Sequence, residues 1–155
     1  MDDDFMMIFM EQKQMDAVKK TNEYVQQFGL SLTESDIQEL MARRRECLTE
    51  QQRIEFGEGI LEKIIFAFCE SDFIDQENYA ETLAELQSIF YLYKNESMDE
   101  LTDDELIKIM RDAFDGECQG SLEYLEETYL EKFAREIRAN TRKFIGRYPG
   151  NDSEI

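Results

Sequence analysis

The sequence predicts an all-α protein, folded as a compact bundle of about six helices. Helix-breaking residues are scarce, because the 155 residues include one proline and seven glycines, and chains this poor in breakers are typically built from long helices. Apolar side chains also recur every three or four residues, which places them on one face of a helix. Eleven Phe and seven Tyr within 42% apolar residues supply a core and argue against disorder.

The first helix is expected over residues 10–28, with Gly29 as its end. Before it, Phe5 to Met10 form a run of six apolar residues behind three aspartates. Because six contiguous apolar residues rarely stay in water, we expect this run to be buried at the start of the helix. The alternatives are an adaptable, methionine-rich contact surface and burial against a second copy of the chain.

Two helices have caps that can be read directly. Thr33 is the expected N-cap of the second helix, with Asp36 as an imperfect capping-box acid. Thr102 and Glu105 form a full Thr-x-x-Glu capping box before the fifth helix, which reaches Gly116. The second helix has apolar residues on one face: Ile37, Leu40, Met41 and Leu48. The fifth has a similar face: Leu106, Ile109, Met110, Ala113 and Phe114.

The other three helices are expected over residues 59–70, 76–94 and 121–140. The fourth has the clearest periodicity, an aromatic and aliphatic stripe with steps of four and three residues: Tyr79, Leu83, Leu86, Phe90 and Tyr93. Stripes at this spacing are ordinary core seams, so the stripe predicts core packing rather than a cofactor site.

The chain length indicates one helical domain, residues 1–147, followed by a flexible tail at 148–155. An offset of 69 residues aligns Leu32-Thr33 with Leu101-Thr102, and residues 61–63 with residues 130–132. Two pseudo-repeated three-helix units would explain this match. Caps and stripes also recur in unrelated helices, which is the alternative explanation.

The charge balance restricts the partners. Seventeen Lys and Arg against 36 Asp and Glu leave a net charge of −19, so a phosphate backbone and an anionic membrane surface would both be repelled. We therefore expect no nucleic-acid partner and no membrane. No apolar run approaches the ~20 residues of a membrane span, and the aspartates of the N-terminus do not fit a signal peptide.

Histidine is absent, which excludes a Ser-His-Asp or Cys-His pair within this chain and a Glu-x-x-His di-iron site. The chain has three cysteines, which are widely spaced: Cys47, Cys69 and Cys118. This pattern fits a reducing compartment, so we expect a cytoplasmic protein in which the cysteines are small core residues.

Residues 115–126 are the one segment that resembles a ligand-binding motif. In the register of an EF-hand loop, oxygen ligands would come from five residues: Asp115, Glu117, Gln119, Ser121 through its carbonyl, and Glu126. Gly120 stands where such a loop turns sharply. The side chains at positions 117 and 119 are longer than the usual Asp or Asn. The pattern favours a helix–turn–helix connection without a cofactor. The alternative is a loop that holds calcium or magnesium through these residues.

Charge is unevenly distributed over the last third of the chain. Residues 96–127 contain 12 acids against two basic residues, whereas the last helix is basic. The acidic stretch predicts either a solvated face that opposes the basic helix or a docking surface for a basic partner. Arg43, Arg44 and Arg45 point in different directions on a helix, so we expect no basic patch there.

Several stretches in the middle of the chain carry a family resemblance: residues 55–57 with 59–61, 67–69, 76–83, 93–96, and 114–116 with 118–123. Through them the chain resembles, over about residues 30–127, a family of uncharacterised bacterial cytosolic proteins. That family has no assigned activity, ligand or catalytic residue, so the resemblance implies a bacterial cytosolic protein and no chemistry.

These observations together favour a non-enzymatic interaction or regulatory protein with a protein partner, which could also form a homodimer. The alternative is a divalent-cation-binding module centred on residues 115–126. A third alternative is an enzyme that uses paired carboxylates for acid–base chemistry. An interaction protein should show an exposed apolar patch, and an enzyme a pocket with two carboxylates of raised pKa.

Overall fold

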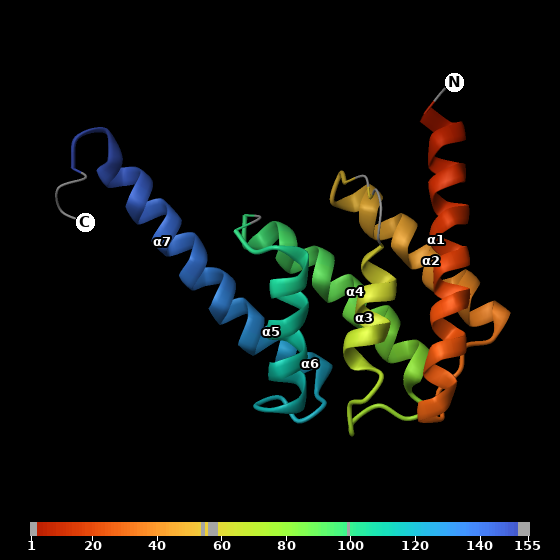
Figure 1. The fold of residues 1–155 in the computed structure, drawn as a ribbon. Coiled ribbons are helices and arrows are strands. Elements are labelled where there is room, and N and C mark those ends of the chain that lie inside the picture. The colour runs from red at the N-terminus through yellow and green to blue at the C-terminus, as the bar shows by residue number, and fades with distance from the viewer. Residues whose placement is uncertain (1–2, 54, 56–58, 99, 152–155) are drawn as a thin grey trace.

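The protein consists of helices joined by short connections (Figure 1). The computed structural model describes residues 3–53, 55, 59–98 and 100–151, with side chains described between residues 5 and 140 apart from residue 7. The helices are α1 (Asp3–Val25), the short 3-10 turn η1 (Gln26–Phe28), α2 (Glu34–Glu50), α3 (Ile60–Phe68), α4 (Tyr79–Glu96), α5 (Asp103–Asp115), α6 (Leu122–Tyr124), the π turn η2 (Leu125–Tyr129) and α7 (Leu130–Asn151).

The all-α prediction is confirmed, since the described residues contain six helices and no strand when α6, η2 and α7 are taken as one continuous helix. Two boundaries differ from expectation. The first helix begins at Asp3 instead of residue 10. The last helix ends at Asn151 instead of residue 140, and residues 152–155 lie outside the described residues. The flexibility of the tail at 148–155 stays a prediction. The domain boundary at residue 147 stays a prediction.

Helix α4 lies at the centre of the fold. It packs against α2, α3, α5 and α7, and in Figure 1 it runs behind α3. The five residues of its predicted stripe are all buried, which confirms the core interpretation. Burial of apolar area is the main favourable contribution to folding. The three cysteines are free and buried, as predicted.

The two predicted caps are present. Thr33 accepts a hydrogen bond from the Asp36 amide, and Thr102 accepts one from the Glu105 amide; in both cases the carboxylate of the acid accepts a hydrogen bond from the backbone amide of the cap residue. These capping boxes satisfy amide groups that have no partner within the helix. The caps stand 69 residues apart, and the pseudo-repeat stays a prediction.

The last helix contains a π turn between α6 and α7. The Leu130 amide donates to the Leu125 carbonyl five residues earlier, which widens the helix at this point. The Glu126 carbonyl accepts a hydrogen bond from the Tyr93 hydroxyl of α4 at 2.5 Å. Beyond the turn, Arg138 forms an ion pair with Glu96 at 2.8 Å. One basic side chain of α7 is therefore used within the fold, as the solvated-face interpretation expects.

The three consecutive arginines of α2 reach three different neighbours. Arg43 donates to Ser88 of α4 at 2.8 Å, Arg44 binds Glu55, and Arg45 binds Glu11 of α1. The prediction that they form no basic patch is confirmed. Together they connect α2 to α1, to α4 and to the segment before α3.

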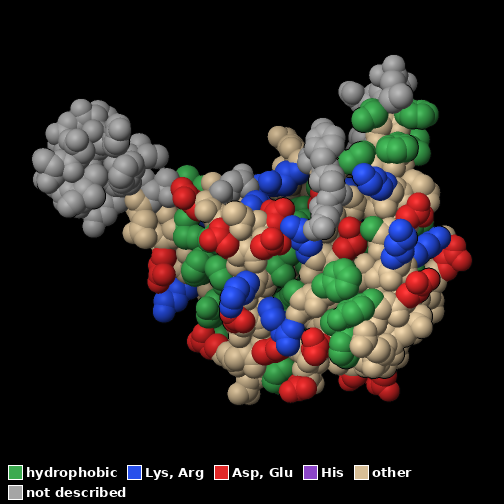
Figure 2. Space-filling view, viewed as in Figure 1, with side chains coloured by type: hydrophobic (Ala, Val, Ile, Leu, Met, Phe, Trp, Pro, Cys, Tyr) green, Lys and Arg blue, Asp and Glu red, His purple; other side chains and the backbone are tan. Residues whose placement is uncertain are grey.

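The expected burial of the apolar N-terminal run is wrong. Residues 3–10, which we call the α1 projection, extend past the neighbouring helices (Figure 1), and hydrophobic side chains gather on them in Figure 2. Phe5, Met6, Ile8 and Phe9 are exposed. The physical reason is rotational: α1 buries the face formed by Gln14, Val18, Thr21 and Val25, and at 100° per residue Phe5 and Phe9 fall on the opposite side.

Candidate functional site

The predicted cation loop connects α5 to α6. Its first candidate ligand, Asp115, is the last residue of α5, and both carboxylate oxygens already accept hydrogen bonds. The Ser71 hydroxyl donates to Oδ1 at 2.6 Å and Arg111 Nε donates to Oδ2 at 2.6 Å. A cation at Asp115 would have to compete with these two donors.

The other candidates shape the turn. Ser121 is the N-cap of α6, where its hydroxyl accepts from the Tyr124 amide at 3.1 Å. Glu117 accepts from the Tyr124 hydroxyl at 3.1 Å. Gln119 and Gly120 have φ angles of 48° and 82°, which is a left-handed conformation that glycine adopts without strain.

Glu126 stands apart from this turn, on η2, and burial raises the pKa of its carboxyl group. Within the described residues, no three carboxylate or thiol groups come close enough together to hold a metal ion. The turn itself is closed by the Gly120 amide, which donates to the Phe114 carbonyl at 2.7 Å. The structure therefore accounts for most of the segment as a helix–turn–helix connection.

Calcium or magnesium binding by residues 115–126 stays a prediction, and calorimetry on metal-free protein checks it. A cation site should give binding heat with calcium that Asp115→Asn removes. Because Asp115 already has two donors, a turn without a cation should give no heat at about millimolar calcium, the weak end of the EF-hand range. That second result would contradict the site.

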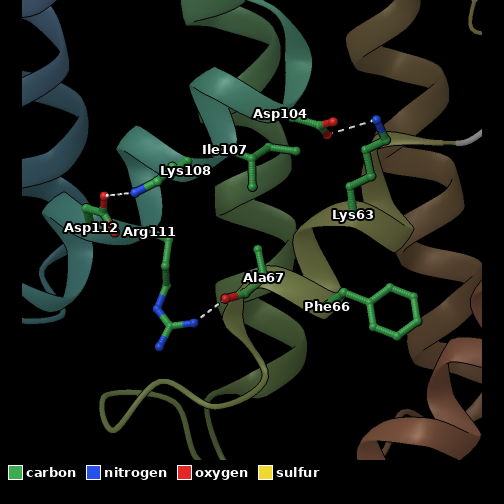
Figure 3. Close-up of a pocket in the computed structure, with 8 residues that line it drawn as sticks. All are labelled: Lys63, Phe66, Ala67, Asp104, Ile107, Lys108, Arg111 and Asp112. Atoms are coloured by element: carbon green, nitrogen blue, oxygen red, sulfur yellow. Dashed lines mark hydrogen bonds and ion pairs between the residues drawn. The ribbon is translucent and has the colours of Figure 1, made fainter.

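An open groove of about 460 Å³ lies between α3 and α5 (Figure 3). From α3 it is lined by Lys63, Phe66 and Ala67, and from α5 by Asp104, Ile107, Lys108, Arg111 and Asp112. The two helices come together because α3 buries Ile64, Ile65 and Phe68 against the rest of the core. Phe66 falls between these positions and is left facing outward.

Charged side chains border the groove and are paired with one another. Lys63 of α3 reaches Asp104 of α5 at 2.9 Å, and Lys108 reaches Asp112 one turn along α5 at 2.8 Å. Arg111 crosses the groove, since one guanidinium nitrogen donates to the Ala67 carbonyl. The groove therefore combines an apolar centre with polar edges, a common form of peptide-binding sites.

An aromatic cluster extends this apolar centre towards α1. Phe66 is 51% exposed, and its ring centroid lies 5.1 Å from that of Tyr24. Tyr24 in turn meets Phe28 edge-on at 5.8 Å. We call Tyr24, Phe28 and Phe66 the aromatic cluster. All three rings are exposed, so α1, η1 and α3 together present a contiguous aromatic surface beside the groove.

A buried polar group lies at the other end of α3. Glu55 binds Arg44 at 3.3 Å and accepts from the Ile60 amide at 3.2 Å and from the Tyr91 hydroxyl. Burial, followed by the Glu55 charge, raises the pKa of Tyr91, so its hydroxyl remains a donor. These bonds satisfy a charge pair that would otherwise be costly to bury.

Glu62 lies beside this group and is buried. Its Oε2 accepts from the Gly59 amide at 3.1 Å, while its Oε1 has no hydrogen-bond partner. Burial is the main cause that raises the pKa of its carboxyl group, and the nearby Glu55 adds to it. Of the two acids, Glu55 is held by Arg44 as an ion pair.

A family model matches most of the chain. The family described as "Family of unknown function (DUF6323)" matches residues 17–143. The chain belongs to this family. No curated protein and no solved structure matches it. The DUF6323 range includes the groove, the aromatic cluster and residues 115–126, while the exposed apolar residues of the α1 projection precede it.

Membership of DUF6323 confirms the resemblance to a family without assigned function, and it transfers no activity. The bacterial origin and the cytoplasmic location stay predictions. Across the described part of the chain, no helix combines the length and apolar character that a membrane span needs.

Sequence reasoning did not find the aromatic cluster. Residues 64–69 are apolar throughout, and in such a run periodicity does not reveal which side chain faces outward.

Proposed function

We propose that this protein is a non-enzymatic interaction protein that binds an amphipathic helix of a protein partner in the groove between α3 and α5. The observation that carries this proposal is the exposed aromatic cluster beside the groove. Surface aromatics that stand together, rather than singly, are characteristic of protein contacts. Aromatic anchors also supply a large part of the binding energy of interfaces.

The groove and its edges suggest the chemistry of the partner. Phe66, Ala67 and Ile107 offer an apolar strip to the apolar face of a helix, as in other helix-in-groove complexes. The paired charges of Lys63 with Asp104 and of Lys108 with Asp112 border that strip. Outside the groove the net charge of −19 attracts basic residues. We therefore expect a helix with an apolar face and basic flanks.

Replacing Phe66 by glutamate is expected to abolish partner binding without unfolding the protein. The side chain is half exposed, so the change removes a contact residue and places a charge in the apolar strip. The measurement is affinity capture with tagged wild-type and variant protein, followed by mass spectrometry. Proteins retained by the wild type should fall at least about tenfold with Phe66→Glu, as for an anchor residue.

Met98→Glu is the matched control. Met98 is also an exposed apolar residue, but it lies in the turn after α4, outside the groove lining and the aromatic cluster. The same proteins should be captured with Met98→Glu as with the wild type. Equal capture by Phe66→Glu and the wild type would contradict the proposal. A direct binding measurement can follow the capture. Because the chain has no tryptophan, Phe66→Trp gives this protein a single fluorescent reporter at the groove, to which each captured protein can be added in a titration.

A further inference from the structure

We propose that the α1 projection pairs in antiparallel orientation with the α1 projection of a second copy of this chain. This inference goes beyond the proposed function, because it uses another surface and another partner. The groove and the aromatic cluster are on α3, α5 and the end of α1, whereas the projection is the beginning of α1 (Figure 1). Two separate surfaces would allow the protein to bind its partner as a dimer.

The first step is that Ile8 and Phe9 of the projection cannot be buried within their own chain. Ile8 is 69% exposed and Phe9 is 57% exposed. The helix is fixed in rotation further along, where Val18 and Val25 are fully buried. Turning Phe9 inward would turn both valines outward. Another molecule must therefore cover these residues if they are to leave water.

The second step concerns charge along the projection. Residues 5–10 contain no charged residue, which matches the depletion of charge in interface cores. Asp3 and Asp4 precede this stretch, and Glu11 and Lys13 follow it. Among the described residues, Glu11 is neutralised by Arg45 of its own chain, which leaves Lys13 as the free charge at that end. In an antiparallel pair centred on Ile8, the acidic end of each helix lies alongside Lys13 of the other. A parallel pair would instead place the acidic ends together.

The third step is the separation of the two molecules. Each carries a net charge of −19, so face-to-face contact of the bodies would be strongly repulsive. The projection stands away from the body (Figure 2), so two projections can overlap while the bodies remain apart. At physiological salt, charges further apart than about 8 Å are largely screened. A membrane is a poorer occupant, since anionic lipids repel the aspartates and the body.

Sedimentation velocity over a concentration series tests the pairing. The full-length wild type is expected to pass from monomer to dimer, with a dissociation constant of about micromolar to submillimolar, as befits a small interface. Ile8→Glu/Phe9→Glu should raise that constant at least about tenfold, while Phe66→Glu should leave it unchanged. A wild type that stays monomeric at about millimolar concentration would overturn the proposal. Dimer loss in Phe66→Glu with retention in Ile8→Glu/Phe9→Glu would overturn it as well.

Introduced cysteines test the orientation. The native thiols are buried, which raises the pKa of Cys47, Cys69 and Cys118 and keeps them unreactive. Ile8→Cys should form a disulfide with itself across the pair. A mixture of Asp3→Cys and Lys13→Cys proteins should cross-link faster than either protein alone. Faster cross-linking of Asp3→Cys alone would overturn the antiparallel arrangement.

Flotation with phosphatidylcholine vesicles distinguishes a lipid occupant. We expect the wild type to remain unbound. Vesicle binding that Ile8→Glu/Phe9→Glu removes, in a protein that forms no dimer, would overturn the second copy as the occupant. Binding of the protein partner in the groove is measured independently of dimerisation. Ile8→Glu/Phe9→Glu should not change it, because this variant leaves Phe66 and the aromatic cluster intact.

Discussion

Arg44→Met is expected to lower the free energy of unfolding by about 3–5 kcal/mol, the usual cost of removing one partner from a buried ion pair. The side chains of Arg44 and Glu55 are only 6% and 9% exposed. Methionine fills most of the volume but leaves the Glu55 carboxylate buried without its cation. Chemical denaturation followed by the circular dichroism of the helices measures the loss.

Two controls isolate the buried charge. Arg43→Met changes the neighbouring arginine, whose side chain is 38% exposed, and should cost less than about 1 kcal/mol. In Arg44→Met/Glu55→Gln the remaining side chain is neutral. Its amide oxygen can accept from the Ile60 amide while its NH2 group donates to the Tyr91 hydroxyl, so part of the lost stability should return. A double variant less stable than Arg44→Met would show that the charge of Glu55 is not the cause.

Phe114→Ala is expected to have an effect of similar size, about 3–5 kcal/mol of lost stability. The ring is fully buried and meets Phe68 edge-on at 5.5 Å and Phe73 at 6.2 Å. Removing it opens a cavity between α3 and α5, directly behind the groove. The measurement is again denaturation, and binding to the captured partner should weaken because the groove walls are no longer held.

Phe66→Ala is the matched control for this cavity. It also removes a phenyl ring, this time from α3, but Phe66 is already half exposed to water. The loss of free energy of unfolding should therefore be only about 1 kcal/mol. The two variants thus separate stability from recognition. Phe114→Ala should mainly destabilise the protein, and Phe66→Ala should mainly weaken binding. Equal loss of stability in both would contradict the burial described for α3.

The parts of the fold that the sequence predicted are those encoded locally. A capping box needs only Thr102 and Glu105, three residues apart, and the stripe of α4 needs only its own spacing. Both are present in the structure as predicted, because tertiary packing does not favour another conformation at these residues. The early start of α1 was missed since an apolar run carries no periodicity to mark a helix.

The candidate site depends on contacts that span the chain, and for this reason the sequence did not reveal it. Lys63 and Asp104 are 41 residues apart, and nothing near either residue indicates the other. Arg44 and Glu55 likewise read as ordinary surface charges, although the fold buries them. The exposure of Phe66 and Phe9 follows from the rotation of α3 and α1 about their axes, which the packing of the other helices sets.

The π turn sets the rotational register of everything that follows it in the last helix. Each residue of an α-helix advances the side-chain direction by 100°, and a π turn accommodates one residue more than an α-helical turn. Without that extra residue, Arg138 would face about 100° away from its present direction and would miss Glu96. The direction in which the basic side of α7 faces is thus set by five residues, Leu125–Tyr129, that carry no basic side chain themselves.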